Sequence, residues 1–448
     1  MQTILARLQE GKQAPDITGC SSASAALLLA RLLEADRRSI CCVLPSEESL
    51  QLLAQDFAFF SSAPLLHFPD LEIPPYTVLK PEAAVLAARV SALYQLLELQ
   101  EPALILTTVD AVCRLVPAPS RLHEHIELLI TGEDTDREAL ISTAVDAGYR
   151  ICELVRQEGD MALRGGIIDI FPPAWHGEPA VPLRLDFFGD TVDSIRAFDP
   201  VSQRSQAELA EVLLLPATEM LYPRGREEQR MVLASFDARA EDSLWAAERV
   251  KTIRENLKLR QQFAGIDTFA SLLSGGLTPL CSFFDYLPEQ CAKILVDAPL
   301  CRRRLAQIYE GIAGNYQTAL AELQPSLAPD ELYLAEAQVE TGLAIQRMAR
   351  LSRLPDPEAN SPHLNMPAKD HTLLAQEMAL SRQKQGMLAP LSARMTEWLI
   401  HGDTIVLSCR SKRQAEHLQS MLAHHQVTVE FSGQTYAQAL PLTKGAVH

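Results

Sequence analysis

The stretch RGGIIDIFPPAWHGEPAVPLRLDFFGDTVDSIRAFDPVSQRS, residues 164–205, decides the fold of the central part of this chain. It opens on Gly165-Gly166, and glycine tolerates the positive φ that successive turn positions require. The apolar run at 167–171 ends in two prolines, as a short strand does. At 183–188 apolar residues alternate with arginine, aspartate and phenylalanine, which predicts a strand with one buried and one exposed face. A third strand is expected after the turn Gly189-Asp190.

The exposed face of the second strand carries Arg184 and Phe188, and Arg164 precedes the first strand. An exposed aromatic ring beside an arginine is typical of a binding hot spot, whereas a lone surface arginine is usually a solvated charge. The pattern alone leaves both interpretations open for these three residues. Asp169 and Asp186 lie within apolar runs, where an aspartate usually forms a local turn or a backbone hydrogen bond, so we expect structural roles for them.

Length and composition predict a protein of about three domains with no membrane span. The chain has 448 residues, of which 47% are hydrophobic and 22% are charged, and this composition is ordinary for globular proteins. Its apolar runs are shorter than the roughly 20 residues of a membrane-spanning helix. Residues 1–15 also lack the apolar region of a signal peptide. We therefore expect a cytoplasmic protein.

The cysteines and histidines of the chain do not form a metal-binding pattern. The 9 cysteines are scattered and show no C-x-x-C spacing, and the 11 histidines are dispersed as well. An odd number of dispersed cysteines favours reduced thiols over a disulfide framework or a structural zinc site. We expect neither a metal ion nor a cofactor.

The formal net charge of −17 argues against unaided, high-affinity wrapping of nucleic acid. A basic strip within a helix-like stretch is usually a solvated helix face, and a phosphate contact is the alternative. Such a strip consists of Arg249, Lys251, Arg254, Lys258 and Arg260.

Residues 1–116 alternate helix-like stretches with short apolar strands at 39–44 and 103–109. Alternation of this kind is typical of a mainly parallel sheet that is covered by helices. Ser46 is expected to cap the helix that follows the first of these strands. Between the second helix and the next one, residues 68–82 contain four prolines, which predicts an ordered loop.

The rest of the chain divides into four further segments. Residues 117–216 hold the strand-rich module, and residues 217–350 are largely helical with one strand at 292–296. Residues 351–388 are rich in proline, asparagine and histidine, which predicts a linker or an extended crossing segment. Residues 389–448 begin a small α/β domain, with a strand expected at 404–408, and end before a sheet is complete. We therefore expect a truncated third domain and a fragment of a longer protein.

Three pieces of the opening stretch together resemble the second domain of the UvrB family, which includes the transcription-repair coupling factors. They are RGGIIDIFPP, RLDFFGD and SIRAFDPVSQRS. In that family this domain docks onto the damage-recognition protein UvrA. The resemblance therefore implies that Arg164, Arg184 and Phe188 bind UvrA. It also implies that residues 1–116 and 217–350 form one degenerate helicase-like parallel-sheet domain, split in sequence by the inserted β-rich UvrA-binding domain.

A nucleotide-hydrolysing member of the family needs G-x-x-x-x-G-K-[ST] before its first helix, where backbone amides cradle the phosphates and the lysine neutralises their charge. Residues 18–25 read TGCSSASA here, which keeps Gly19, Ser22 and Ser24 but neither the second glycine nor the lysine. The acidic box is also incomplete, because Asp297 is followed by alanine where a catalytic glutamate would stand. We therefore expect a helicase-like fold without ATPase chemistry.

The resemblance implies a non-catalytic module that recruits UvrA to stalled transcription complexes for nucleotide excision repair. In the longer family proteins, later domains bind RNA polymerase and translocate on double-stranded DNA. The alternative is a UvrB-type ATPase that verifies DNA damage, which requires the lysine loop, the acidic box and a DNA-clamping β-hairpin. Residues 68–82 run into a helix and leave no room for that hairpin. A third hypothesis is that a later domain masks the UvrA-facing surface in the intact protein.

Overall fold

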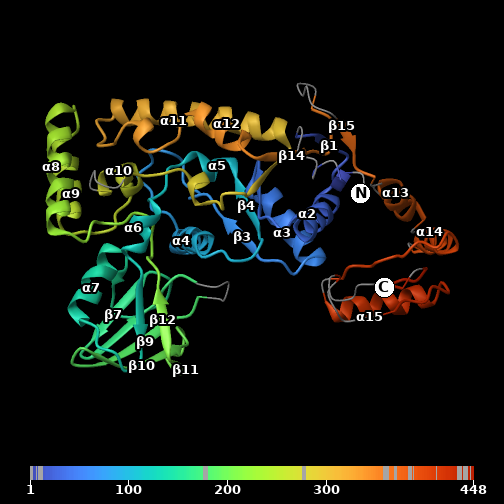
Figure 1. Cartoon of the computed structure of the whole chain (residues 1–448), viewed down its shortest axis with the longest axis horizontal. Helices are drawn as coiled ribbons and strands as arrows, with labels where there is room; N and C mark the ends of the chain where they lie inside the picture. Colours follow the sequence, from blue (N-terminus) through green and yellow to red (C-terminus); the bar gives the residue numbers. More distant parts are fainter. Residues whose placement is uncertain are drawn as a thin grey trace.

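Two β-sheets dominate the computed structural model of the chain (Figure 1). The larger sheet lies at the centre and the smaller one belongs to a module that projects from it. The structure describes residues 4–6, 8, 14–174, 180–274, 279–356, 363–367, 371–381, 386, 388–409, 411–430, 436, 442–443 and 445–448.

The larger sheet has seven strands in the order β15-β1-β14-β13-β2-β4-β3, and all neighbouring strands are parallel. Four of them precede the projecting module in the sequence and three follow it, so one sheet is completed from two separate segments. The strands are β1 (Asp16–Thr18), β2 (Ile40–Leu44), β3 (Leu65–Phe68), β4 (Leu104–Thr108), β13 (Ala292–Val296), β14 (Arg347–Leu351) and β15 (His363–Asn365).

Helices cover both faces of this sheet. In β2, Cys41 and Val43 pack into one apolar cluster, while Ile40, Cys42 and Leu44 pack into the other. Because strand side chains alternate, a strand that is buried on both faces needs an unbroken apolar run. One layer contains α2 (Ser22–Asp36) and α3 (Glu47–Phe60), and the other contains α4 (Ala83–Leu97), α5 (Val109–Cys113), α11 (Ala298–Ala321) and α12 (Glu336–Ala344).

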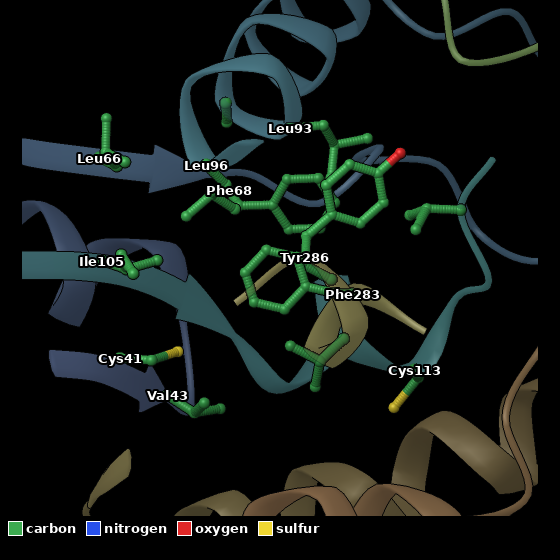
Figure 2. Close-up of a cluster of buried hydrophobic side chains, with 14 of the residues drawn as sticks. Cys41, Val43, Leu66, Phe68, Leu93, Leu96, Ile105, Cys113, Phe283 and Tyr286 are labelled. Atoms are coloured by element: carbon green, nitrogen blue, oxygen red, sulfur yellow. The ribbon is translucent and has the colours of Figure 1, made fainter. Parts of the chain in front are cut away.

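An aromatic pair at the centre of the second layer joins the two segments that build the sheet (Figure 2). The rings of Phe68 and Phe283 stack with centroids 4.5 Å apart and an interplanar angle of 15°. Phe68 ends β3, whereas Phe283 begins the short 3-10 helix η2 (Phe283–Tyr286). Leu93 of α4 and Ile105 of β4 belong to the same cluster.

A local sequence signal sets the start of α3 as predicted. The hydroxyl oxygen of Ser46 accepts a hydrogen bond from the amide of Ser49 at 3.3 Å, which confirms the predicted cap of α3. Residues 69–82, all of them described, contain no strand. Instead, the loop packs on the helical third segment, where the hydroxyl of Tyr76 donates to the carbonyl oxygen of Leu327 at 3.1 Å.

The third segment forms a helical hairpin and a buried cluster of its own. The rings of Phe236 and Phe269 lie 5.9 Å apart, centroid to centroid, within this cluster. The helices are α8 (Arg226–Asp242), α9 (Ala247–Lys258), α10 (Ala270–Leu273) and the 3-10 helices η1 (Ile266–Phe269) and η3 (Pro329–Glu331).

The inserted module contains a six-stranded sheet in the order β11-β10-β9-β8-β7-β6 and a two-stranded sheet of β5 and β12. Helix α7 and the two-stranded sheet share an apolar core with one face of the larger of these sheets. The strands predicted at 167–171 and 183–188 are confirmed, the first of them ending one residue earlier, at Ile170. The elements are α6 (Pro119–His123), β5 (Glu127–Ile130), α7 (Arg137–Asp146), β6 (Arg150–Ile151), β7 (Asp160–Arg164), β8 (Ile167–Ile170), β9 (Leu183–Phe188), β10 (Thr191–Phe198), β11 (Ser205–Leu209) and β12 (Glu211–Leu214).

The last part of the chain differs from its predicted organisation in three places, the first of which is helix α13 (Thr372–Ser381) inside the expected linker. Part of the expected linker, residues 363–365, is the edge strand β15, which pairs with β1 in parallel. The strand expected at 404–408 is reduced to a single bridge between Ile405 and Val447. Other parts of the expected linker, such as residues 357–362, lie outside the described residues. The helices are α13 (Thr372–Ser381), α14 (Ala389–Ile400) and α15 (Lys412–Ala423).

In the described part of the chain, no helix is long and apolar enough to cross a membrane. The same residues contain no group of three or more histidine, cysteine, aspartate or glutamate side chains that would hold a metal ion. All of the cysteines are free thiols, and six of them are buried. Burial raises the pKa of the Cys113 thiol to about 12, so this sulfur stays protonated.

Candidate partner-binding face of the inserted domain

One face of the six-stranded sheet carries a row of side chains in register. Strand pairing sets Ala162 opposite Asp169, Asp169 opposite Arg184, Arg184 opposite Arg196, and Arg196 opposite Glu208. Because directly paired residues point to the same side of a sheet, these five side chains form one row across β7 to β11. The residues that alternate with them in sequence face the apolar core under α7.

Asp169 and Arg184 form a bidentate ion pair within this row. Nε of Arg184 lies 2.7 Å from Oδ1 of Asp169, and Nη2 lies 2.9 Å from Oδ2. The Asp169 side chain is 1% exposed and that of Arg184 is 17% exposed. The hydrogen bonds from Arg184 to Asp169 raise the pKa of the guanidinium above its ordinary value. The guanidinium carbon also lies 5.0 Å from the centroid of the Phe198 ring, a cation–π distance.

This pair corrects the expectation that Arg184 points outward as an exposed charge. The register of β8 and β9 places a buried carboxylate opposite Arg184, and the alternation of one strand cannot reveal that partner. The expectation of a structural role for Asp169 holds, although its partner is an arginine side chain and not a backbone group. The assignment of Arg184 to UvrA binding stays a prediction.

Arg164 ends β7, and its side chain is 47% exposed. Its Nη2 donates to the carbonyl oxygen of Glu153 at 2.9 Å, and its Nη1 lies 3.8 Å from Oδ2 of Asp169. The structure therefore brings two of the predicted residues, Arg164 and Arg184, to a single buried carboxylate.

Phe188 is 83% exposed at the end of β9. The turn Gly189-Asp190, in which Gly189 has φ +66°, connects it to β10. The Gly165-Gly166 turn lies alongside, since the amide of Phe187 donates to the carbonyl oxygen of Gly166 at 2.8 Å. A Cβ at position 166 would lie 2.8 Å from the carbonyl oxygen of Phe187, so this approach requires glycine. Two hairpin ends thus lie side by side, with an exposed aromatic ring at one of them.

A second ion pair on this face, between Arg196 and Asp186, was not expected from the sequence. The hydroxyl of Ser194 donates to the same carboxylate at 2.8 Å. The pairing of β10 with β9 shifts between Val192 and Ser194. A shift of this kind breaks the period of two, so counting from the turn assigns Arg196 to the wrong face. The serine and arginine spaced by two residues are the only sequence signal that remains.

The loop at the expected phosphate site bonds its own amides within the protein. The amide of Gly19, where φ is +74°, donates to the carbonyl oxygen of Arg353 at 3.2 Å. The amide of Cys20 donates to the carbonyl oxygen of Ser352 at 3.0 Å. Both acceptors directly follow β14, so the loop extends the pairing of the sheet.

Ser21 and Ser24, which follow this loop, cap helix α2. The amide of Ser24 donates to Oγ of Ser21 at 3.2 Å, and the amide of Ser21 donates to Oγ of Ser24 at 2.9 Å. This reciprocal arrangement is a capping box, which satisfies donors that are otherwise open at a helix start. The hydroxyl of Ser22 is buried and has no hydrogen-bond partner.

Asp297 and this loop line one cavity of about 700 Å³, together with Gly19 and Ser22. Asp297 immediately precedes α11 with φ +52°, and its Oδ1 accepts from the amide of Arg353 at 3.4 Å. Ala298, at the expected position of a catalytic glutamate, is 2% exposed and packs in the apolar core. The structure thus brings Gly19 and Ser22 of the expected phosphate loop and Asp297 of the expected acidic box to one cavity.

The basic strip on and after α9 is largely engaged in ion pairs. Arg254 binds Asp237 through Nε at 2.7 Å and Nη2 at 2.9 Å. Arg260 donates to Asp146 of the inserted domain at 2.7 Å. The interpretation of the strip as a solvated helix face, with a phosphate contact as the alternative, stays a prediction.

The chain thus combines a parallel α/β sheet with an inserted β-rich domain, one face of which carries polar side chains in register. Residues 128–220 match the family described as the UvrB interaction domain. The chain is 30% identical over 451 residues to the transcription-repair-coupling factor of Myxococcus xanthus, covering 96% of this chain and 36% of that protein. The resemblance inferred from the sequence is thereby confirmed.

Two further relatives are another transcription-repair-coupling factor and a UvrABC system protein B. The transcription-repair-coupling factor of Escherichia coli K12 is 25% identical over 94% of this chain and 34% of its own length. The UvrABC system protein B of Legionella pneumophila strain Corby is 24% identical over 96% of this chain and 68% of its own length. The chain spans about a third of the length of these two transcription-repair-coupling factors.

Proposed function

We propose that the inserted domain of this chain docks onto UvrA and thereby recruits excision repair to stalled transcription complexes. The observation that carries this proposal is the exposed Phe188 on the same sheet face as the half-exposed Arg164. The match of residues 128–220 to the UvrB interaction domain supports it, and so do relatives named transcription-repair-coupling factor and UvrABC system protein B. RNA polymerase and double-stranded DNA would be bound by other regions of a longer protein.

Short-range contacts would supply the affinity. Burying a phenylalanine ring that is exposed in the free protein stabilises a complex by about 1.5–3 kcal/mol. Arg164 offers a guanidinium that is able to pair with a partner carboxylate in a charge-assisted hydrogen bond. Since the chain has a net charge of −17, it would repel an acidic partner surface at long range. We therefore expect affinity to depend on dissociation rate more than on salt-sensitive association.

We further propose that this region does not hydrolyse nucleotide and that its larger sheet serves as a scaffold. The lack of the phosphate-loop lysine supports this, as do the amides of Gly19, Cys20, Ser21 and Ser24, which are bonded within the protein. A triphosphate at this position would have to displace those bonds without a lysine to neutralise its charge. The alternative, a damage-verifying ATPase, has no comparable support.

The docking proposal is tested by Phe188→Ala, with Val201→Ala as the matched control. Val201 is 92% exposed in the turn after β10, at the opposite end of that strand from Phe188. We expect Phe188→Ala to weaken binding to immobilised UvrA by at least about tenfold, as truncation of a hot spot does. Val201→Ala should bind like the unmodified chain, and both variants should keep its melting temperature. Undiminished binding of a folded Phe188→Ala variant would overturn the proposal.

A further inference from the structure

We infer that Asp169 is a positioning residue of the docking face, whose buried carboxylate orients Arg164 and Arg184 before a partner arrives. This inference rests on the proposed function, because it concerns how the same face is prepared for binding. Asp169 is too buried to touch a partner itself, since its side chain is 1% exposed. Its effect on binding would have to pass through the two arginines that it contacts.

Three contacts fix the guanidinium of Arg184, two hydrogen bonds to Asp169 and one contact with an aromatic ring. Nε and Nη2 each donate to a different oxygen of Asp169, which sets the plane of the group. The ring of Phe198 lies beneath it, with 5.0 Å between the guanidinium carbon and the ring centroid. Nη1 takes part in neither of these bonds, so this nitrogen is the edge of Arg184 that remains for a partner acceptor.

Arg164 depends on the same carboxylate from the other side. Its Nη1 lies 3.8 Å from Oδ2 of Asp169, while its Nη2 is held by the carbonyl oxygen of Glu153. Oδ2 therefore lies between the two arginines, 2.9 Å from Nη2 of Arg184 on one side. The two guanidinium groups, which both lie near Oδ2, repel each other, and the negative charge of Asp169 between them offsets that repulsion.

Preorganisation is the physical gain from this arrangement. A long arginine side chain that is free in solution loses rotamer freedom when it binds, and this loss reduces affinity. Here the ordering of Arg184 occurs on folding and not on binding. Because Asp169 is shielded from water, its attraction for both guanidinium groups is screened less than that of a surface carboxylate.

Asp186 provides a matched control on the same face. It lies two residues after Arg184 on β9, and its hydrogen bonds go to Arg196 and Ser194. Asp186→Asn removes one negative charge from the sheet, as Asp169→Asn does, but leaves the carboxylate between Arg164 and Arg184 in place. A general effect of net charge on UvrA binding would therefore appear in both variants.

The test is a double-mutant cycle on UvrA affinity with Asp169→Asn and Arg164→Ala. We expect Asp169→Asn to weaken binding about tenfold, in line with the cost of immobilising rotamer-rich side chains, and Asp186→Asn to change it less than twofold. In the Asp169→Asn background the loss of affinity caused by Arg164→Ala should be at least about threefold smaller, because Arg164 has already lost the attraction of the Asp169 carboxylate there. Equal effects of Arg164→Ala in both backgrounds would overturn the inference.

Two further measurements keep the outcome decisive. If Asp169→Asn does not fold, the cycle is repeated with Asp169→Leu and Arg184→Met together, since apolar replacement of a buried pair commonly restores stability. The Nε–H resonance of Arg184, followed by NMR in the isolated chain, should exchange slowly with water and become fast in Asp169→Asn. Fast exchange in the unmodified chain overturns the inference whether or not UvrA binds. Failure of the unmodified chain to bind UvrA would instead refute the proposed function.

Discussion

Arg89 and Glu219 form an ion pair at 3.0 Å in which the two side chains are 0% and 1% exposed. Arg89 lies on α4, and Glu219 lies in the segment that returns from the inserted domain. Arg89 also donates to the carbonyl oxygen of Pro69 at 2.6 Å, and its guanidinium carbon lies 4.2 Å from the centroid of the Phe68 ring. The pair therefore joins the returning segment to the core of the larger sheet.

Removing one member of this pair should destabilise the protein strongly. Arg89→Met leaves the Glu219 carboxylate buried without its partner, which is expected to lower the free energy of unfolding by about 3–5 kcal/mol. Replacing both residues, Arg89→Met with Glu219→Leu, should recover most of the loss, because no charge is then left buried. Urea denaturation of the three proteins measures this. An equal loss in the single and double variants would contradict the prediction.

Gly148 is a second sensitive position, at the end of α7. It has φ +92°, and a Cβ there would lie 2.2 Å from Cγ2 of Thr218. We expect Gly148→Ala to lower the free energy of unfolding by about 2–4 kcal/mol through backbone strain and overpacking. Gly132 has φ +88° with no atom within 4 Å of the Cβ position, so Gly132→Ala should show only the strain, about 1–2 kcal/mol. Similar losses at both positions would mean that the contact with Thr218 relaxes at no cost.

The loop between β1 and α2 should not support nucleotide hydrolysis. The purified chain is expected to release no phosphate from ATP above a buffer blank, with or without DNA, in a malachite-green assay. Ser21→Ala should lower the free energy of unfolding by about 1 kcal/mol because α2 loses its cap, and should still show no phosphate release. DNA-stimulated release that disappears in Asp297→Asn would show that the acidic-box remnant is active.

Asp146 gives the stability of the chain a pH dependence of known sign. Burial raises the pKa of Asp146 from 3.8 to about 6, in spite of the attraction of Arg260. Because the folded protein binds this proton more tightly than the unfolded chain, the contribution of Asp146 to stability falls as pH rises from about 4 to about 6 and is constant above that range.

The comparison with Asp146→Asn isolates this effect. The free energy of unfolding of the unmodified chain, relative to the variant, should fall by about 2–3 kcal/mol between pH 4 and pH 7. Asp193→Asn, at an exposed position of β10, controls for the loss of a negative charge. A difference between the unmodified chain and Asp146→Asn that does not vary with pH would refute the prediction.

The sequence predicts well those elements whose pattern is local. The alternation in β9, the serine before α3 and the unbroken apolar run of β2 each reflect interactions between residues close in the chain. These signals indicate the class of fold and the exposed position of Phe188. Gly19 and Asp297 are far apart in the sequence, and no local pattern predicts which strands become neighbours. Only the resemblance to a known family predicts that these two residues lie close together.

The part of the candidate site that depends on register was not predictable. Arg184 has the same local pattern whether it faces solvent or a buried carboxylate, and the difference lies in the strand set beside it. The shift in β10 hides Arg196 for the same reason. Residues 363–365 read as linker because a three-residue edge strand contains too little alternation to be detected, and its pairing partner β1 is far away in sequence.

The separation of β1 from its neighbours has a consequence for biosynthesis. Thr18 of β1 and Asn365 of β15 are hydrogen-bonded at 2.6 Å across 347 residues, and β14, on the other side of β1, is nearly as distant. At roughly 5–20 residues per second, a ribosome needs roughly 20–70 seconds to make the intervening chain. β1 lacks β15 throughout that time and β14 for nearly all of it, whereas the strands of the inserted domain are complete once residue 214 has been made. The docking domain is thus able to fold on the nascent chain well before the sheet that carries it is complete.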